Sequence, residues 1–177
     1  MNTKRIAVWA ALFFSLLIFV LVVDQQPRQP GKQTSEPSAP RIFTCPADDL
    51  QDILLTRHAR TLRLMKTARG WTTEPPCNDK VTQDHLTSFV TTLLDTPQLE
   101  VVARNGAARE QFGLTTPWAR IVVRCKGINT DQELLLGALT PSQVSLYAQI
   151  QGQDSIFLVG TYLSFSLNTL MDAAGLK

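Results

Sequence analysis

The most uniformly apolar stretch of this chain lies close to its N-terminus. From Ile6 to Val23 every residue is apolar except Ser15, which makes a run of 18 residues. At about 1.5 Å per helical residue the run would extend about 27 Å, close to the thickness of a bilayer's hydrocarbon core. Lys4 and Arg5 precede it, so the positive-inside bias places residues 1–5 in the cytoplasm. We therefore expect one transmembrane helix at residues 6–23, with everything after it outside the cytoplasm.

A cleaved signal peptide is the alternative explanation of the same run. It requires a shorter apolar core, followed by small residues around a cleavage site. The residues from Val20 to Gln26 contain no A-x-A pattern, and no cysteine follows closely enough to suggest a lipoprotein. These features favour a retained anchor. We expect a single-pass protein of the bacterial inner (cytoplasmic) membrane, whose C-terminal domain is periplasmic or otherwise extracytoplasmic.

The composition changes abruptly after the apolar run. Residues 24–41 consist mainly of Gln, Pro, Ser, Lys and Gly, and include four prolines and no large apolar residue. Such a segment favours extended conformations and would act as a linker reaching up to roughly 50 Å, at about 3 Å per residue. Residues 42–177 form the remaining part of the chain, which is long enough for one hydrophobic core and too short for two ordinary domains.

Within residues 42–177, two kinds of hydrophobic period alternate. In the first half, strands are predicted at Asp52–Arg57, Thr61–Lys66 and Gly70–Thr73, with a polar turn at His58-Ala59-Arg60. Apolar residues from Val81 to Leu94 then fall on one helical face, with Asn78 or Asp79 as the cap and Thr96-Pro97 as the end of the helix.

A further strand is predicted at Leu99–Ala103, before the second half opens near Glu110. The second half repeats the order of strands followed by a helix. Strands are predicted there at Ala119–Cys125, Gln132–Leu136, Ser145–Ile150 and Ser155–Val159, and a last helix from Tyr162 to about Ala173, with Leu163, Leu167, Leu170 and Met171 available for the core. The predicted fold class is α+β: antiparallel β-meanders, each closed by a helix. This order suggests a weak structural duplication of β-β-β-α type, without a residue-level repeat.

Charge does not favour a nucleic-acid partner. The chain has 17 Lys and Arg against 15 Asp and Glu, and two of the basic residues precede the apolar run, which leaves 15 basic and 15 acidic residues beyond it. A neutral, mixed surface lacks the basic stripe that nucleic-acid binding needs.

Three cysteines, Cys45, Cys77 and Cys125, lie in the expected oxidising compartment, and sequence alone permits three pairings. We favour Cys45 with Cys77, because both flank the first meander and the closed loop would gain roughly 3 to 4 kcal/mol. Cys125 would then be free. The alternative that all three are unpaired stays open, because sequence cannot test whether the Cα atoms approach within about 7 Å.

No pattern of catalytic or metal-binding residues emerges from the sequence. The two histidines, His58 and His85, neighbour no nucleophile, and Asp48 with Asp49 lacks the alternating ligands of a calcium loop. No CxxC, HxxxH or glycine-rich phosphate loop is present. We expect a non-enzymatic protein without a metal or cofactor.

Several short motifs resemble a known family. These are Trp71 to Pro75, Phe112-Gly113-Leu114, Thr116-Pro117, Leu135-Leu136-Gly137, Tyr147-Ala148 and the strand Ile156 to Val159 before a terminal helix. Together they resemble the domain of unknown function 4340, over roughly Ile42 to Asp172. The resemblance implies an N-terminally anchored extracytoplasmic α/β domain, of a kind often encoded beside auxiliary components of gliding-type ABC transporters. It supplies no catalytic residues.

The resemblance assigns structural roles to five positions. Phe112 would pack, Gly113 and Gly137 would permit tight turns, Pro117 would start a strand, and Leu114 completes the motif.

Two functional hypotheses follow. The first is an accessory or scaffold subunit that binds a membrane complex, such as an ABC-type transporter. The second is a periplasmic small-ligand-binding or sensing module, with a pocket lined by Trp71, Trp118 or Phe112. An enzyme would instead need titratable residues clustered in a cleft.

Overall fold

The computed structural model describes residues 39–74, 80–104, 109–128 and 130–176. They belong to a compact unit that begins at Ala39. The expected membrane span Ile6–Val23 and almost all of the expected linker lie outside the described residues. Among the residues that are described, none of the helices has the length and apolar character needed to cross a bilayer.

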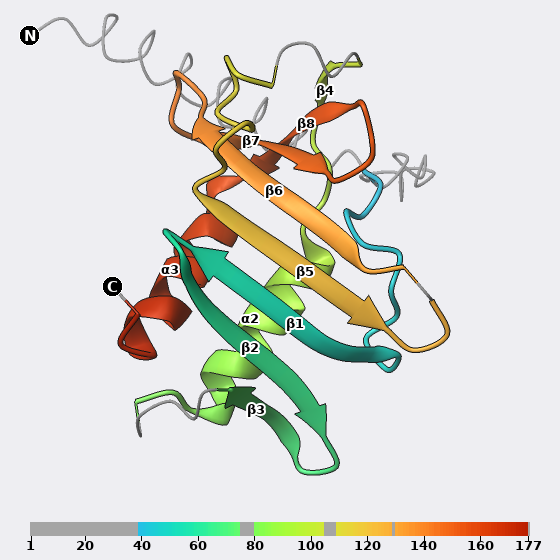
Figure 1. The fold of residues 1–177 in the computed structure, drawn as a ribbon, viewed down its shortest axis with the longest axis vertical. Helices are drawn as coiled ribbons and strands as arrows, with labels where there is room; N and C mark the ends of the chain where they lie inside the picture. The colour runs from blue at the N-terminus through green and yellow to red at the C-terminus, as the bar shows by residue number, and fades with distance from the viewer. Residues whose placement is uncertain (1–38, 75–79, 105–108, 129, 177) are drawn as a thin grey trace, which may run out of the picture. The chain divides into compact units, whose positions relative to one another are not determined.

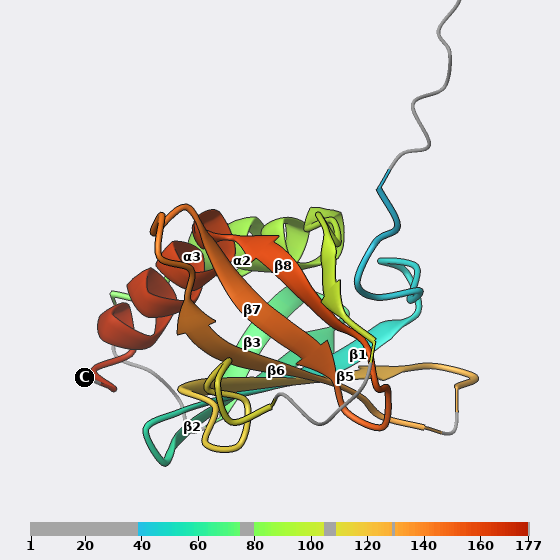
Figure 2. The ribbon, with the colours of Figure 1, turned by 90° about the horizontal axis from the view of Figure 1, so that it is seen from above.

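The described residues form one antiparallel sheet of eight strands in the order β3-β2-β1-β5-β6-β7-β8-β4 (Figure 1). The strands are β1 (Leu50–Arg57), β2 (Arg60–Thr67), β3 (Gly70–Glu74), β4 (Val101–Ala103), β5 (Ala119–Cys125), β6 (Gln132–Leu139), β7 (Ser145–Ile150) and β8 (Ile156–Gly160). Helices α2 (Gln83–Asp95) and α3 (Thr161–Ala173) both lie on one face of this sheet, as Figure 2 shows. The α+β class expected from the sequence is confirmed.

The strand order reflects the two halves of the sequence. Strands β1 and β5, the first strands of the two predicted meanders, pair with each other near the middle of the sheet. From this pair β2 and β3 extend to one side and β6 and β7 to the other, and each meander leads into a helix. The second half has four strands, β5 to β8, before α3, as the strand predictions indicated, which is one strand more than a β-β-β-α unit.

Helix α2 starts later than the sequence suggested. Its N-cap is Thr82, whose hydroxyl accepts a hydrogen bond from the His85 backbone N–H (3.3 Å), while His85 Nδ1 accepts one from Thr82 N–H (3.4 Å). This reciprocal pair is a capping box in which histidine replaces the usual Glu or Gln. The expected caps Asn78 and Asp79 lie outside the described residues.

The apolar faces of both helices form the core with one side of the sheet. All four residues proposed for the inner face of the last helix are buried: Leu163, Leu167, Leu170 and Met171. They pack with inward residues of the central strands such as Ile53, Leu55 and Ile121. Regular periodicity therefore located the core correctly.

The structure pairs Cys45 with Cys125, with Cα atoms 6.1 Å apart. The favoured Cys45–Cys77 pairing and the free Cys125 are therefore wrong, and Cys77 itself lies outside the described residues. The reason is the sheet topology: β5 pairs directly with β1, with Leu50 opposite Cys125. This brings the end of β5 to the segment that precedes β1.

Candidate functional site

A loop between β4 and β5 covers part of the sheet face that the helices leave open. Leu114 from this loop is fully buried against Leu135 and Ile156, which point away from the helix-covered core. Phe112 and Tyr147 pack at the border of this second cluster, with ring centroids 4.5 Å apart. Figure 2 shows the loop, in gold, on the side of the sheet opposite α2 and α3.

Two glycines allow the loop to approach β6 closely. Gly113 has a φ of 69°, a backbone conformation that glycine adopts without strain. A Cβ at Gly137 would lie 2.2 Å from the carbonyl oxygen of Phe112. Since that atom is backbone, no side chain could rotate away to make room. Positions 113 and 137 thus require glycine for two different reasons, strain and close approach.

The contact with the loop interrupts the pairing of β6 with β7. Ala138 donates its N–H to the carbonyl of Phe112 (2.9 Å), and the register between the two strands shifts between Leu136 and Leu139. Such an irregularity bends the strand and redirects its side chains. The loop therefore shapes β6 on the opposite, helix-covered face as well.

A cavity of about 310 Å³ lies at this irregular end of β6. It is lined by Arg57, His58, Trp118, Gly137, Ala138, Leu139, Leu146, Ser164 and Asn168. These residues come from the end of β1 and the turn after it, from the residue just before β5, and from β6, β7 and α3, so segments far apart in the sequence line it. Its size is at the lower end of the range for small-molecule sites.

One wall of the cavity carries the nearly buried guanidinium of Arg57. The side chain of Arg57 is only 10% exposed, and its guanidinium donates to Asn168 Oδ1 (2.7 Å), Asp172 Oδ1 (2.9 Å) and the Leu176 carbonyl (2.6 Å). A buried guanidinium needs such partners because burial of an unpaired charge is costly. The end of β1 is thereby fixed to α3.

The turn that follows Arg57 has an unusual backbone. Both residues between β1 and β2 have positive φ, 46° for His58 and 65° for Ala59. Two-residue hairpins with a type I′ turn require positive φ at both positions, and glycine, asparagine or aspartate usually supplies it. The turn is one residue shorter than the predicted His58-Ala59-Arg60, since Arg60 already belongs to β2.

The structure separates the predicted site residues into groups. Phe112, Gly113, Leu114 and Gly137 meet at the loop over β6, while Trp71 is buried beneath α2, with three strands between β3 and β6. Pro117 is half-buried just before β5, and Pro75 lies outside the described residues. Of the three aromatic residues proposed to line a pocket, only Trp118 lines the cavity.

Sequence reasoning did not single out Arg57, Asn168 or Asp172. A signal for Arg57 was present, because alternation along β1 places it on the same face as Ile53 and Leu55. For Asn168 and Asp172 no such signal existed. They sit 111 and 115 residues from Arg57 in the chain, and only the packing of α3 reveals the contact.

The family model described as "Domain of unknown function (DUF4340)" matches residues 71–174. The chain belongs to the DUF4340 family. The family inferred from the short motifs is thus confirmed, although β1 and β2 lie before the matched range. No curated protein and no solved structure matched the chain.

The helix layer of this DUF4340 domain carries exposed aromatic side chains. Tyr162 and Phe165 on α3 are each 66% exposed, and Leu99 nearby is 51% exposed. Tyr162 and Leu99 line a groove of about 440 Å³ between the C-terminal end of α2 and the start of α3. A second, smaller hollow between the same helices includes Tyr162 and Phe165. An apolar surface therefore runs across the helix layer.

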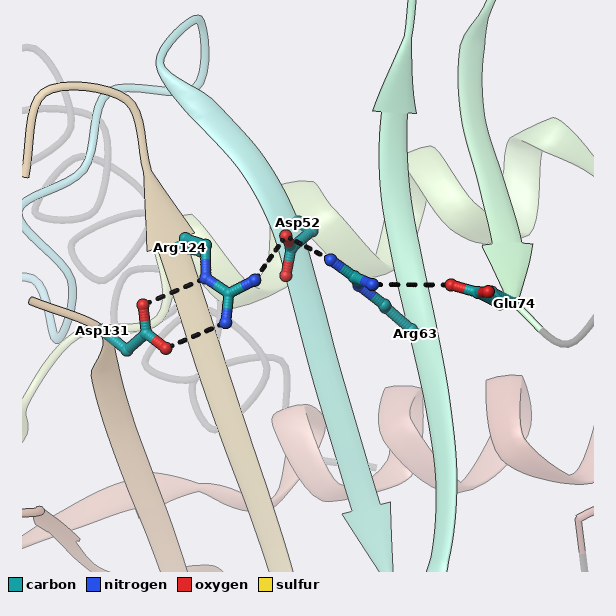
Figure 3. A network of polar contacts seen from close by, with 5 residues as sticks. All are labelled: Asp52, Arg63, Glu74, Arg124 and Asp131. Carbon is teal, nitrogen blue, oxygen red and sulfur yellow. Dashed lines mark hydrogen bonds and ion pairs between the residues drawn. The ribbon is translucent and has the colours of Figure 1, made fainter. Parts of the chain in front are cut away.

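The open sheet face from β3 across β2 and β1 to β5 has the opposite character. Five side chains alternate in charge across it, in the order Glu74, Arg63, Asp52, Arg124 and Asp131 (Figure 3). The nearly buried carboxylate of Asp52 lies 3.0 Å from Arg63 and 3.1 Å from Arg124. We call these five residues the charge ladder.

The charge ladder also affects titration at its end. Hydrogen bonds from Arg124 hold the pKa of Asp131 below its usual value, and those bonds together with the Asp52 charge raise the pKa of Arg124. Because Asp131 is half exposed, solvent screens much of this effect. Among the described residues, no three His, Cys, Asp or Glu side chains form a group that could hold a metal ion.

Proposed function

We propose that this DUF4340 protein is a non-enzymatic, membrane-anchored accessory subunit of an envelope complex. Its domain would sit in the periplasm or an equivalent extracytoplasmic space and bind a membrane partner such as an ABC-type transporter. The observation that carries this proposal is the apolar surface of the helix layer, formed by Leu99, Tyr162 and Phe165.

Several properties of the surface suit a protein partner. Exposed aromatic side chains that line a groove between two helices are typical of interface centres, where tyrosine and phenylalanine are enriched. The side chains that line the larger groove are uncharged except Asp95, which already pairs with Arg41 at 3.4 Å. An apolar rather than a charged partner surface would fit here. We propose an amphipathic helix of the partner as the occupant, because it could pack along α2 and α3.

The disulfide supports an extracytoplasmic location. Bonds such as Cys45–Cys125 form and persist in oxidising compartments and are rare in the cytosol. The expected anchor at Ile6–Val23 and the expected linker at residues 24–41 supply the attachment to the membrane. Together these features support a domain held outside the membrane and free to contact a neighbouring complex.

Site-specific crosslinking in cells tests the proposal. A photo-reactive phenylalanine analogue is placed at Phe165 in the full-length protein with a C-terminal tag, and crosslinked products are purified and identified. We expect a defined membrane-complex subunit to be captured at Phe165. The matched control is the same analogue at Ile128, an exposed apolar residue in the β5–β6 loop. This position should capture that subunit at least several-fold less.

Other outcomes would overturn the proposal. Capture of a second copy of the same chain from Phe165 would make the surface a self-association interface. Equal capture from Phe165 and Ile128 would show that the apolar surface does not direct the contact. Replacement of Tyr162 by serine should reduce capture at Phe165, and unchanged capture would also contradict the proposal.

A further inference from the structure

We propose that the cavity beside Trp118 binds a small, mostly apolar organic carboxylate. This site lies apart from the apolar surface of the helix layer and does not depend on the accessory role. It gives a specific location to a ligand-binding or sensing function of the domain.

The walls of the cavity suit the apolar part of such a ligand. Trp118, Leu139 and Leu146 face the space, and Leu139 is itself 51% exposed. An aromatic side chain beside aliphatic ones is a common lining for small-molecule sites. The volume of about 310 Å³ restricts the ligand to a compact molecule.

The polar groups of the cavity supply more donors than acceptors. Asn168 Oδ1 accepts from Arg57, so the oxygen is used and the amide nitrogen remains, with no partner among the described residues. Arg57 has five N–H groups, and three hydrogen bonds engage them within the described part of the domain. Ser164 gives its hydroxyl hydrogen to the Thr161 carbonyl.

The same contacts favour a negatively charged ligand. Arg57 lines the cavity, whereas its counter-ion Asp172 does not. A ligand with an acceptor group, and above all a carboxylate, would match the unused donors and the nearby positive charge. His58, which also lines the cavity, adds a ring that can also donate.

The irregular pairing of β6 with β7 keeps this space open. The loop contact between Phe112 and Ala138 withdraws part of β6 from its partner strand, and the cavity lies at that point. Gly137 lines the cavity and also makes the loop contact possible. Of the family motif residues, Gly137 lines the proposed site, while Phe112 affects it through its contact with β6.

Binding is measured on the full-length protein in detergent micelles, with benzoate as the probe and benzamide as its uncharged counterpart. The signal is the indole N–H resonance of Trp118, identified among the three tryptophans by a Trp118→Phe variant. We expect benzoate to shift this resonance to saturation and benzamide to bind several-fold more weakly. No saturable shift with benzoate, or equal binding of both probes, would overturn the proposal.

Two variants locate the binding. Ser164→Met places a longer side chain in the cavity and should abolish the benzoate shift, while Ser166→Met on the other side of α3 should leave it unchanged. Asn168→Asp keeps an oxygen for Arg57 but replaces the amide donor by a carboxylate. It should weaken benzoate binding about tenfold or more. Unchanged affinity in either Ser164→Met or Asn168→Asp would refute the site.

Discussion

The two halves of the sheet share an arrangement of strands but differ on the face that the helices leave open. In the first half, β3, β2 and β1 pair in regular register, and three residues of the charge ladder, Glu74, Arg63 and Asp52, lie on their open face. The ladder continues onto β5 through Arg124. In the second half, the loop before β5 covers the same face with Leu114, and β6 shifts register against β7.

The same arrangement of strands thus supports a regular half, made of β3, β2 and β1, and a covered half, in which the loop before β5 packs on the sheet. The regular half needs only alternation, with apolar side chains facing the helices and charged ones facing solvent. The covered half contains four of the family motif residues, Phe112, Gly113, Leu114 and Gly137, and the cavity lies behind them. The family features therefore mark where the second half departs from the regular pattern.

The largest expected effect comes from cutting the bond that joins the two halves. Replacing Cys45 and Cys125 by alanine opens a link between residues 80 positions apart, which should lower the free energy of unfolding by about 4 kcal/mol. Urea unfolding of the full-length protein, followed by tryptophan fluorescence, measures this loss.

The matched control is Cys77→Ala, which leaves the Cys45–Cys125 bond intact and should change stability much less. Mass spectrometry of non-reduced peptides gives a direct check, because it should recover Cys45 joined to Cys125. Recovery of Cys45 joined to Cys77 instead would restore the pairing favoured by sequence.

The next effect is confined to the covered half. Gly137→Ala would place a Cβ 2.2 Å from the Phe112 carbonyl, so the loop must move and the free energy of unfolding should fall by about 3 kcal/mol. The control is Gly160→Ala, because Gly160 has an ordinary φ and no atom within 4 Å of an added Cβ. Thermal unfolding compares the two variants, and similar losses would contradict the close-approach argument.

A smaller effect is expected in the regular half. Asp52→Ala removes the carboxylate shared by Arg63 and Arg124 and leaves two like charges on neighbouring strands, which should cost about 1 to 2 kcal/mol. The partners are partly exposed, which keeps the cost below that of a fully buried pair. Urea unfolding at low and high salt tests this prediction. A loss in Glu74→Ala as large as in Asp52→Ala would show that the central position has no special role.

The smallest effect should be a gain in stability. Ala59→Gly relieves a positive φ of 65° at the β1–β2 turn and should stabilise the domain by up to about 1 kcal/mol. Ala138→Gly, in the irregular part of β6, has no such conformation to relieve and should not stabilise. A destabilised Ala59→Gly variant would argue against the left-handed turn.

The sequence predictions were most accurate for features that depend on residues close together in the chain. Strands β5 and β7 were predicted with their observed bounds, and the inner face of α3 was identified residue by residue. These features depend on periodicity within one element. The start of α2 was missed because the apolar residue Val81 precedes the capping box that Thr82 and His85 form.

The candidate site was much less accessible to the same reasoning. The motif at Phe112 to Leu114 and Gly137 was recognised, but its effect on β6 depends on a contact between two segments. The ligand-binding hypothesis placed Trp71 and Phe112 beside a pocket. They are instead packed in two separate apolar clusters.

The sequence by itself determined the elements, the α+β class and the family, because each depends on local spacing or on short motifs along the chain. Tertiary structure alone decided the partner of Cys45, the contact of Arg57 with Asn168, and the cavity beside Trp118. Each of these joins residues many positions apart. Their distances are set by which strands pair and where α3 packs, and no local pattern encodes that choice.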